Sequence, residues 1–256
     1  MSKISAVANF THRANVRHRV MTTLLVFSIV LAGGVVLFPA LIPGADEKAL
    51  VDTSFALVEL LGFFAMLFSL SVMFFRELES RVMVLELTKP LYRWQYLLGK
   101  WLGTVQTLAW TLFYMASIMV LVIFINTMAF TPAYFYVFLY LFLEFVLLSS
   151  LAVLFSVLTT SLPASVLFNL GVFVLGHGSI LIKGFAGLVP NIFLSWSLRG
   201  LYFLLPHLDY YNLKETVGEG FLNVGPHDLL LVLSYTCVYS AMALILSTMV
   251  FRQRDI

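Results

Sequence analysis

Six long apolar runs alternate with shorter polar stretches along the chain. A helix needs about 20 residues to cross ~30 Å of hydrocarbon, and each run is long enough or nearly so. The expected transmembrane helices cover residues 20–41, 54–75, 102–125, 134–158, 164–182 and 229–251. The runs are continuous and lack the alternation that is typical of barrel strands, which favours helices. The pattern predicts an all-α polytopic membrane protein, with residues 1–256 forming a single transmembrane domain.

The composition agrees with this fold class. Hydrophobic residues make up 61% of the chain and charged residues 11%, whereas a soluble domain has about 45–50% and about 25%. The single cysteine allows no intrachain disulfide. A net charge of +2 gives no indication of a nucleic-acid partner.

The basic residues gather on one side of the predicted topology. These are Lys3, Arg13, Arg17, Arg19, Arg76, Arg81, Lys89, Arg93, Lys100, Arg252 and Arg254. The other side holds Lys48, Lys183, Arg199 and Lys214. Since basic loops stay on the cytoplasmic side, both termini are expected inside the cell.

Two polar regions stand out, residues 76–101 on the cytoplasmic side and 183–228 on the external side. The external region is rich in apolar and aromatic residues and is interrupted by glycine and proline. This favours short helices at the outer interface over a solvated loop.

The cytoplasmic region begins with an amphipathic pattern. Leu78, Val82 and Leu85 recur at helical spacing over residues 76–88. Pro90 then sets a corner and can start a second helix. That second helix is expected to hold its polar and aromatic side chains at the membrane surface, namely Arg93, Trp94, Tyr96 and Lys100.

Two interpretations of this region stay open. Its basic residues favour anchoring to anionic lipid. Its three acidic residues, Glu77, Glu79 and Glu86, would be repelled by such a surface and favour docking to a protein.

The glutamate-rich helix is followed by KPLYRWQYLLGK, which leads into the third of six spans. With this arrangement, the region resembles the permease subunits of type-2 ABC exporters. The basic stretch RANVRHRV is similar to the N-terminal interfacial helix of these permeases, here expected within residues 1–19, and FRQRDI is similar to their basic tail. The likeness covers nearly the whole chain.

The resemblance implies that the helix between spans two and three couples the permease to a separate cytoplasmic ABC ATPase. The residues expected to serve this coupling are Arg76, Glu77, Glu79, Ser80, Arg81, Glu86, Pro90 and Arg93. It also implies two ATPase copies and a second permease copy, as a homodimer or with a close paralogue.

Among the acidic and basic residues, three fall within the predicted spans, Glu59, Glu144 and His177. A charge at the bilayer centre costs at least ~2.5–3.5 kcal/mol, so such a group faces the bundle, a partner or a cavity. Glu144 is expected either at the dimer interface or translocation route, or neutral and bonded to a neighbouring helix, for example through Ser149, Ser150 or Asn169. His177 is expected to be an interfacial polar group, with a ligand role as the alternative.

No catalytic motif is present in the sequence. Gly99-Lys100 lacks the earlier glycine and the following Ser/Thr of a P-loop, and the histidines form no H-E-x-x-H pair. A G-x-S-x-G nucleophile elbow is also missing. The chain is therefore expected to be non-enzymatic and to hold no cofactor or metal, with ATP and magnesium bound by the partner.

The expected function is that of a permease subunit of an ATP-driven exporter in a prokaryotic inner membrane, in contact with membrane lipids. The alternative is a non-catalytic membrane anchor or assembly factor that recruits a cytoplasmic partner through the same helix. A secondary transporter is disfavoured because the sequence shows no inverted repeat.

Overall fold

The computed structural model describes residues 3–17, 22, 26, 28–30, 33, 47–80, 92–128, 131–188, 192–213 and 225–253. Every regular element in these ranges is a helix. The prediction of an all-α polytopic protein is confirmed for this part of the chain. Of the expected first span, only residues 22, 26, 28–30 and 33 are described, and they are helical.

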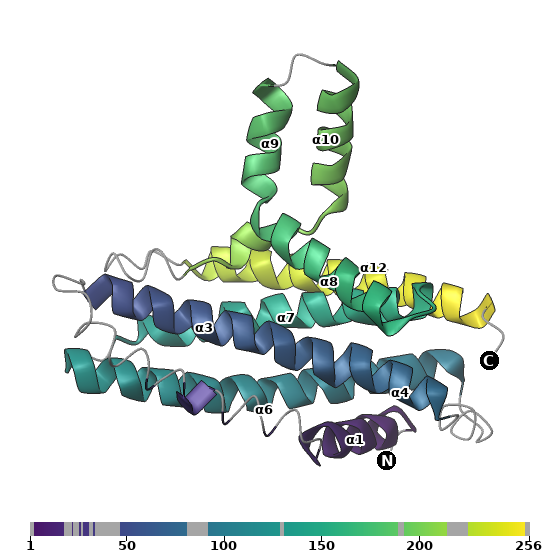
Figure 1. Cartoon of the computed structure of the whole chain (residues 1–256), viewed down its shortest axis with the longest axis horizontal. Coiled ribbons are helices and arrows are strands. Elements are labelled where there is room, and N and C mark those ends of the chain that lie inside the picture. The colour runs from purple at the N-terminus through teal and green to yellow at the C-terminus, as the bar shows by residue number, and fades with distance from the viewer. Residues whose placement is uncertain are drawn as a thin grey trace.

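Four long helical segments lie along the longest axis of the molecule (Figure 1). They are α3 (Glu47–Leu67) with its continuation, α6 (Arg93–Thr127), α7 (Ala133–Leu158) and α12 (Pro226–Gln253). Each is long and apolar enough to cross a membrane, and each contains one of the predicted spans. The continuation of α3 is a π-helical turn, η1 (Phe68–Val72), followed by α4 (Met73–Glu79).

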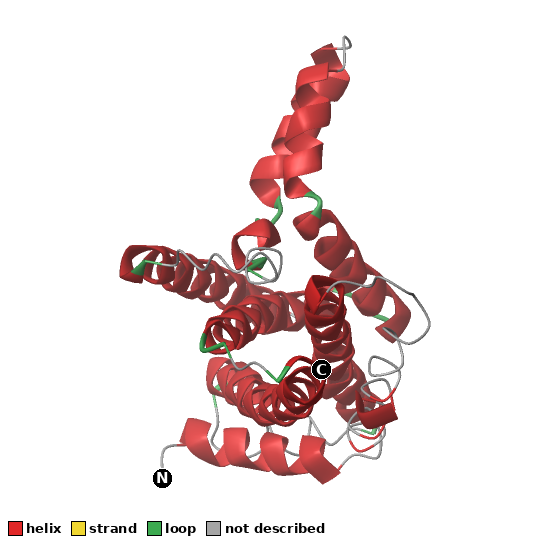
Figure 2. Ribbon diagram, turned by 90° about the vertical axis from the view of Figure 1, so that its left-hand side faces the viewer, coloured by secondary structure: helices red, strands yellow, loops and turns green. Residues whose placement is uncertain are grey.

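α7 packs against α3, α6, α8 and α12 and therefore lies at the centre of the bundle, which Figure 2 shows along its long axis. It is apolar around its whole circumference and buried along most of its length. A helix that is apolar on all sides belongs in a core or a bilayer. α12, in contrast, leaves most of its apolar surface exposed to the membrane or a partner.

The fifth predicted span differs from the observed structure. α8 (Leu162–His177) starts after Ser161 with Pro163 in its first turn, a position that favours helix initiation. It ends at Gly178, where the chain bends by 68° into α9 (Ser179–Leu188). The apolar run continues through this glycine. The predicted span, which ends at residue 182, therefore includes the start of α9.

The expected external region contains two short helices in an antiparallel hairpin. α9 and α10 (Ile192–Leu204) pack side by side and project away from the bundle (Figure 1). A short 3-10 helix, η2 (Leu208–Tyr211), then returns the chain to α7 and α8.

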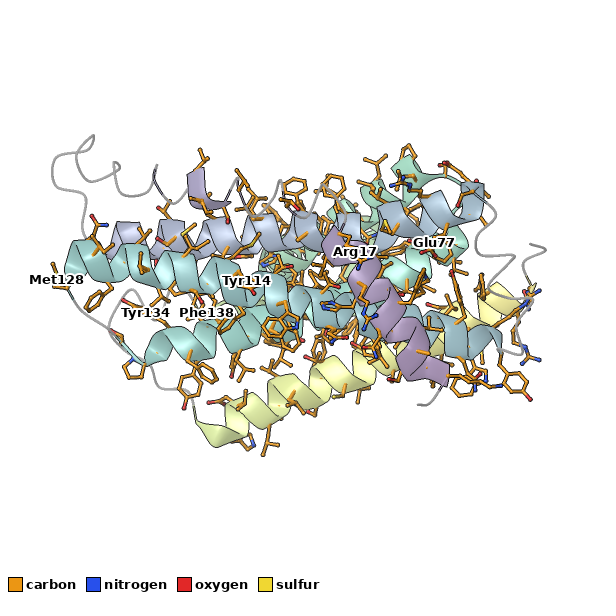
Figure 3. The ribbon with its side chains drawn as sticks, turned by 90° about the horizontal axis from the view of Figure 1, so that it is seen from below. Arg17, Glu77, Tyr114, Met128, Tyr134 and Phe138 are labelled. Carbon is orange, nitrogen blue, oxygen red and sulfur yellow. The ribbon has the colours of Figure 1, made fainter. Side chains whose placement is uncertain are left out.

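The N-terminal helix α1 (Lys3–Arg17) crosses α6 near the end of the bundle that holds Glu77 (Figures 1 and 3). Asn15 donates a hydrogen bond to Ser69 at 2.6 Å, and His12 Nδ1 lies 3.1 Å from the Thr107 hydroxyl. Burial and the nearby Arg13 lower the pKa of His12, so its ring is neutral at pH 7. Side-chain hydrogen bonds thus hold α1 against the bundle.

The close approach of α1 depends on glycine in α6. A Cβ added at Gly103 would lie 2.5 Å from the Ala8 carbonyl oxygen, and one at Gly99 would lie 2.6 Å from Val7 Cβ. Glycines four positions apart on one helix face allow two helix backbones to meet.

Gly103→Ala is therefore expected to destabilise the protein by about 1–3 kcal/mol through overpacking. Gly171→Ala is the matched control, because an added Cβ there has no atom within 4 Å. The control should be neutral or slightly stabilising, since alanine favours helix. Thermal unfolding in detergent measures both, and equal shifts would contradict this account of α1 packing.

Candidate functional site

Glu77, near the end of α4, is held by two side chains from α6. Lys100 Nζ lies 2.5 Å from Glu77 Oε1, and the Tyr96 hydroxyl donates to Oε2 at 2.9 Å. The side chains of Glu77 and Lys100 are nearly buried, at 12% and 10% exposure. The carboxylate thus joins α4 to α6 immediately before residues 81–91, the segment that connects them.

The structure corrects the expected position of two residues in the second half of this region. Tyr96 and Lys100 were expected at the membrane surface, but both are buried and face Glu77. Trp94 is exposed, as expected for a surface residue. The reason is that the Glu77 carboxylate supplies a charge partner for the lysine and a hydrogen-bond acceptor for the tyrosine, so both can be buried in the bundle.

The other predicted coupling residues separate into three groups. Arg76, Glu79 and Ser80 are exposed at the end of α4. Arg93 donates from one guanidinium nitrogen to the carbonyl oxygens of Phe251 and Arg252, at 2.8 and 3.2 Å, and so caps the last turn of α12. Arg81, Glu86 and Pro90 lie outside the described residues.

A second site brings the three intramembrane ionisable residues together. His177 Nε2 lies 2.9 Å from Glu59 Oε1 and 3.4 Å from Glu144 Oε1. The residues come from α8, α3 and α7, and Glu144 is 1% exposed. We call Glu59, Glu144 and His177 the triad.

The side chains that lie beside Glu144 differ from the partners that the sequence suggested for it. Ser149, Ser150 and Asn169 instead donate to backbone carbonyl groups of their own helices. Gly62 permits the close approach of α3 to α7 beside the triad, because a Cβ there would lie 2.6 Å from the Phe145 ring. Neither the pairing nor this approach has a signature within any single segment of the sequence.

The chain after α10 covers the triad and is fastened to α12 by tyrosines. The Tyr235 hydroxyl accepts from the His207 N–H at 3.0 Å, and the Tyr239 hydroxyl donates to the Leu204 carbonyl at 2.9 Å. The hydroxyls of Tyr211 and Thr236 are 2.6 Å apart. No signal in the sequence pointed to Tyr235 and Tyr239, whose spacing in α12 resembles ordinary apolar packing.

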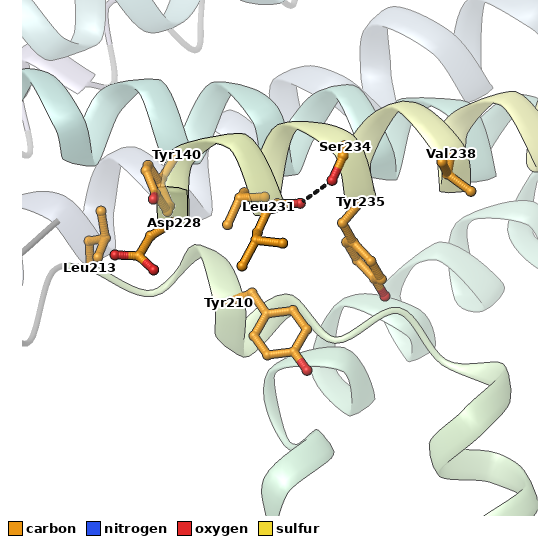
Figure 4. Close-up of a pocket in the computed structure, with 9 residues that line it drawn as sticks. Tyr140, Tyr210, Leu213, Asp228, Leu231, Ser234, Tyr235 and Val238 are labelled. Carbon is orange, nitrogen blue, oxygen red and sulfur yellow. Dashed lines mark hydrogen bonds between the residues drawn. The ribbon is translucent and has the colours of Figure 1, made fainter. Parts of the chain in front are cut away.

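A cavity of about 750 Å³ lies beside this covering segment (Figure 4). Its walls are mostly apolar or aromatic, with polar groups from Asp228 and Ser234. Leu213 lines both this cavity and the small space around the triad. The triad is therefore separated from a roomy cavity by one short segment of chain.

A buried serine cluster lies between the two sites. Ser71, from η1, is 3.5 Å from the hydroxyls of both Ser156 and Ser165, which are 3.2 Å from each other. π-helical turns within α-helices often occur at functional positions. The helix that bears Glu59 and Glu77 thus contacts α7 and α8 through polar groups at an irregular turn.

Together, these features define a multi-pass helical membrane protein with a buried ionisable triad and a braced interhelical connection at one end. The model of a family described as ABC-2 family transporter protein matches residues 10–256. The chain therefore belongs to this family, which confirms the resemblance to type-2 ABC permeases. No curated protein gives a significant match to the sequence.

Membership makes the chain the membrane component of a transporter and implies an ABC ATPase subunit as its partner.

Proposed function

We propose that the chain is the permease subunit of an ATP-driven exporter in a prokaryotic inner membrane, with both termini cytoplasmic. Two permease copies, surrounded by lipid, form the translocation path with two copies of a separate ATPase. ATP and magnesium bind to that partner. The family match supports the membrane role, and the distribution of basic residues supports the orientation.

The observation that carries the coupling mechanism is the pair of contacts that Glu77 makes with side chains of α6. The ion pair with Lys100 and the hydrogen bond from Tyr96 brace the point where α4 ends and the connecting segment begins. A force applied to residues 81–91 by the ATPase would act directly on this point. Exposed Glu79 and Arg76 are suited to contact the partner, whereas Glu77 is suited to transmit the contact.

The second span gives this force a route into the bundle. α3, η1 and α4 form one continuous helical segment that carries Glu77 at one end and Glu59 of the triad further along. These residues are separated by roughly 18 positions, or about 27 Å of helix. Movement of α4 would therefore change the position of α3 against α7 and α8, the helices that supply the rest of the triad.

The test is ATP hydrolysis by the purified complex in proteoliposomes. Glu79→Lys should abolish most of the stimulation of the ATPase by the permease and leave thermal stability unchanged, because it reverses an exposed charge. The matched control is Glu47→Lys, the same reversal at the first residue of α3.

Three outcomes would contradict the proposal. They are isolation under mild detergent without any ATPase, full stimulation in Glu79→Lys, and equal loss in the two variants. A membrane anchor would retain its partner without stimulating ATP hydrolysis, so the same measurement separates the two functions.

A further inference from the structure

The triad has the composition and geometry of a cation site. Two carboxylates and one imidazole from three different helices place their ligand atoms within 4.8 Å of one another. We propose that Glu59, Glu144 and His177 bind one divalent transition-metal ion, which fastens α3, α7 and α8 together. This inference does not depend on ATP-driven export.

The orientation of the histidine ring supports this assignment. His177 Nδ1 lies 3.0 Å from the Phe173 carbonyl oxygen. A carbonyl oxygen has no proton to donate, so Nδ1 must carry the proton of this bond. In the neutral ring, Nε2 then directs its lone pair toward the two carboxylates. A backbone carbonyl that fixes the ring through the other nitrogen is the usual arrangement for metal-binding histidine.

The distances between ligand atoms fit a small ion. Bonds of about 2.1 Å place ligand atoms about 3.0 Å apart at right angles and about 3.4 Å apart at tetrahedral angles. The two distances from His177 Nε2, 2.9 and 3.4 Å, lie at these values. Only a small adjustment of the side chains would be needed to admit the ion.

Charge balance gives a physical reason for the ion. With the imidazole neutral, two ionised carboxylates bring a charge of −2 into the bundle, which a divalent ion would neutralise. Buried charges in proteins are paired or coordinate metals, because an isolated charge is costly in an apolar medium. The apolar surroundings here are Phe55, Val137 and Leu141.

The donor set identifies the class of ion. Imidazole with carboxylates suits zinc, manganese, iron or cobalt, whereas calcium and magnesium prefer oxygen alone. Within the described residues, the triad is the one group of three such side chains close enough to share an ion. Asn212, which lines the same space, would add an amide oxygen from the covering segment.

The adjacent cavity provides an approach for the ion. Asp228 places an acidic side chain in its wall, and Leu213 separates it from the triad. A displacement of residues 211–213 would connect the two spaces. Metal binding in a bundle core requires such an entry path.

The experiment uses Co²⁺ as the probe on full-length protein carrying no histidine tag, after removal of metals with a chelator. We expect one Co²⁺ per chain by elemental analysis. In Glu144→Gln and His177→Gln, the Kd for Co²⁺ should rise by at least about 100-fold, since even loss of a supporting residue costs 10–100-fold.

The matched control is His227→Ala. Exposed His227, whose ring nitrogen lies 4.0 Å from the Asp228 carboxylate, is an alternative place for weak surface binding. The control should retain the single ion. Retention of the ion in Glu144→Gln, or its loss in the control alone, would overturn the assignment.

X-ray absorption of Co²⁺ on the unmutated protein makes the test independent of whether the variants fold. One imidazole nitrogen and otherwise oxygen ligands are expected. A sulfur ligand, such as that of exposed Cys237, or two imidazoles would overturn the proposal. So would the lack of bound Co²⁺, in which case the triad holds protons only.

Discussion

Replacement of Glu77 by lysine is expected to uncouple the permease from its ATPase and also to destabilise the bundle. The new ammonium group would face Lys100, whose own partner at 2.5 Å would be lost. Breaking a nearly buried ion pair costs on the order of 3 kcal/mol. Stimulated ATP hydrolysis and the apparent Tm in detergent should therefore both fall.

Two further variants separate this effect from a simple change of surface charge. Glu79→Lys makes the same substitution at an exposed position and should leave the Tm unchanged. The double variant Glu77→Lys/Lys100→Glu restores opposite charges and should recover much of the Tm. If Glu77→Lys and Glu79→Lys have equal Tm values, Glu77 does not brace α4 as we propose.

His177→Ala, studied without added metal, is expected to give the largest loss of stability within the membrane. It removes the group between two carboxylates that are almost completely buried. Removal of one partner from a buried charged group costs about 3–5 kcal/mol, because the remaining charge has no compensation. The apparent free energy of unfolding by denaturing detergent measures this loss.

The control for this variant is His12→Ala, which removes a part-buried histidine that bonds the neutral Thr107 hydroxyl. Its cost should be near 1 kcal/mol, the usual net value of one hydrogen bond. Adding Glu59→Gln and Glu144→Gln to His177→Ala should recover most of the loss, since the triad positions then carry no charge. A small effect of His177→Ala, similar to that of His12→Ala, would show that the carboxylates are not charged in the native protein.

The apolar runs predicted much of the bundle. The expected segments 54–75, 102–125, 134–158 and 229–251 each lie within one long helix. A run of apolar residues has few alternatives in a bilayer, because the backbone must satisfy its own hydrogen bonds there. The fifth segment was less well predicted, since mean hydropathy does not register the change of direction at Gly178.

Charge patterns identified the residues of both sites but not their partners. Lys100 was counted with the surface charges, yet its side chain is folded against Glu77. Glu144 was compared with serines and an asparagine in α7 and α8, yet it lies beside His177 and Glu59. Sequence spacing reveals neighbours within a helix, whereas these contacts depend on which helices are adjacent and how they are rotated.

From the sequence we could predict a helical membrane protein, the positions of most of its long helices and the family that it resembles. These properties follow from local composition and from motifs within single segments. The folded structure was needed to show that Glu59, Glu144 and His177 meet, that Glu77 is held by α6, and that α9 and α10 leave the bundle. Each of these features depends on packing between segments that are distant in the sequence, including the close helix approach that Gly62 and Gly103 allow.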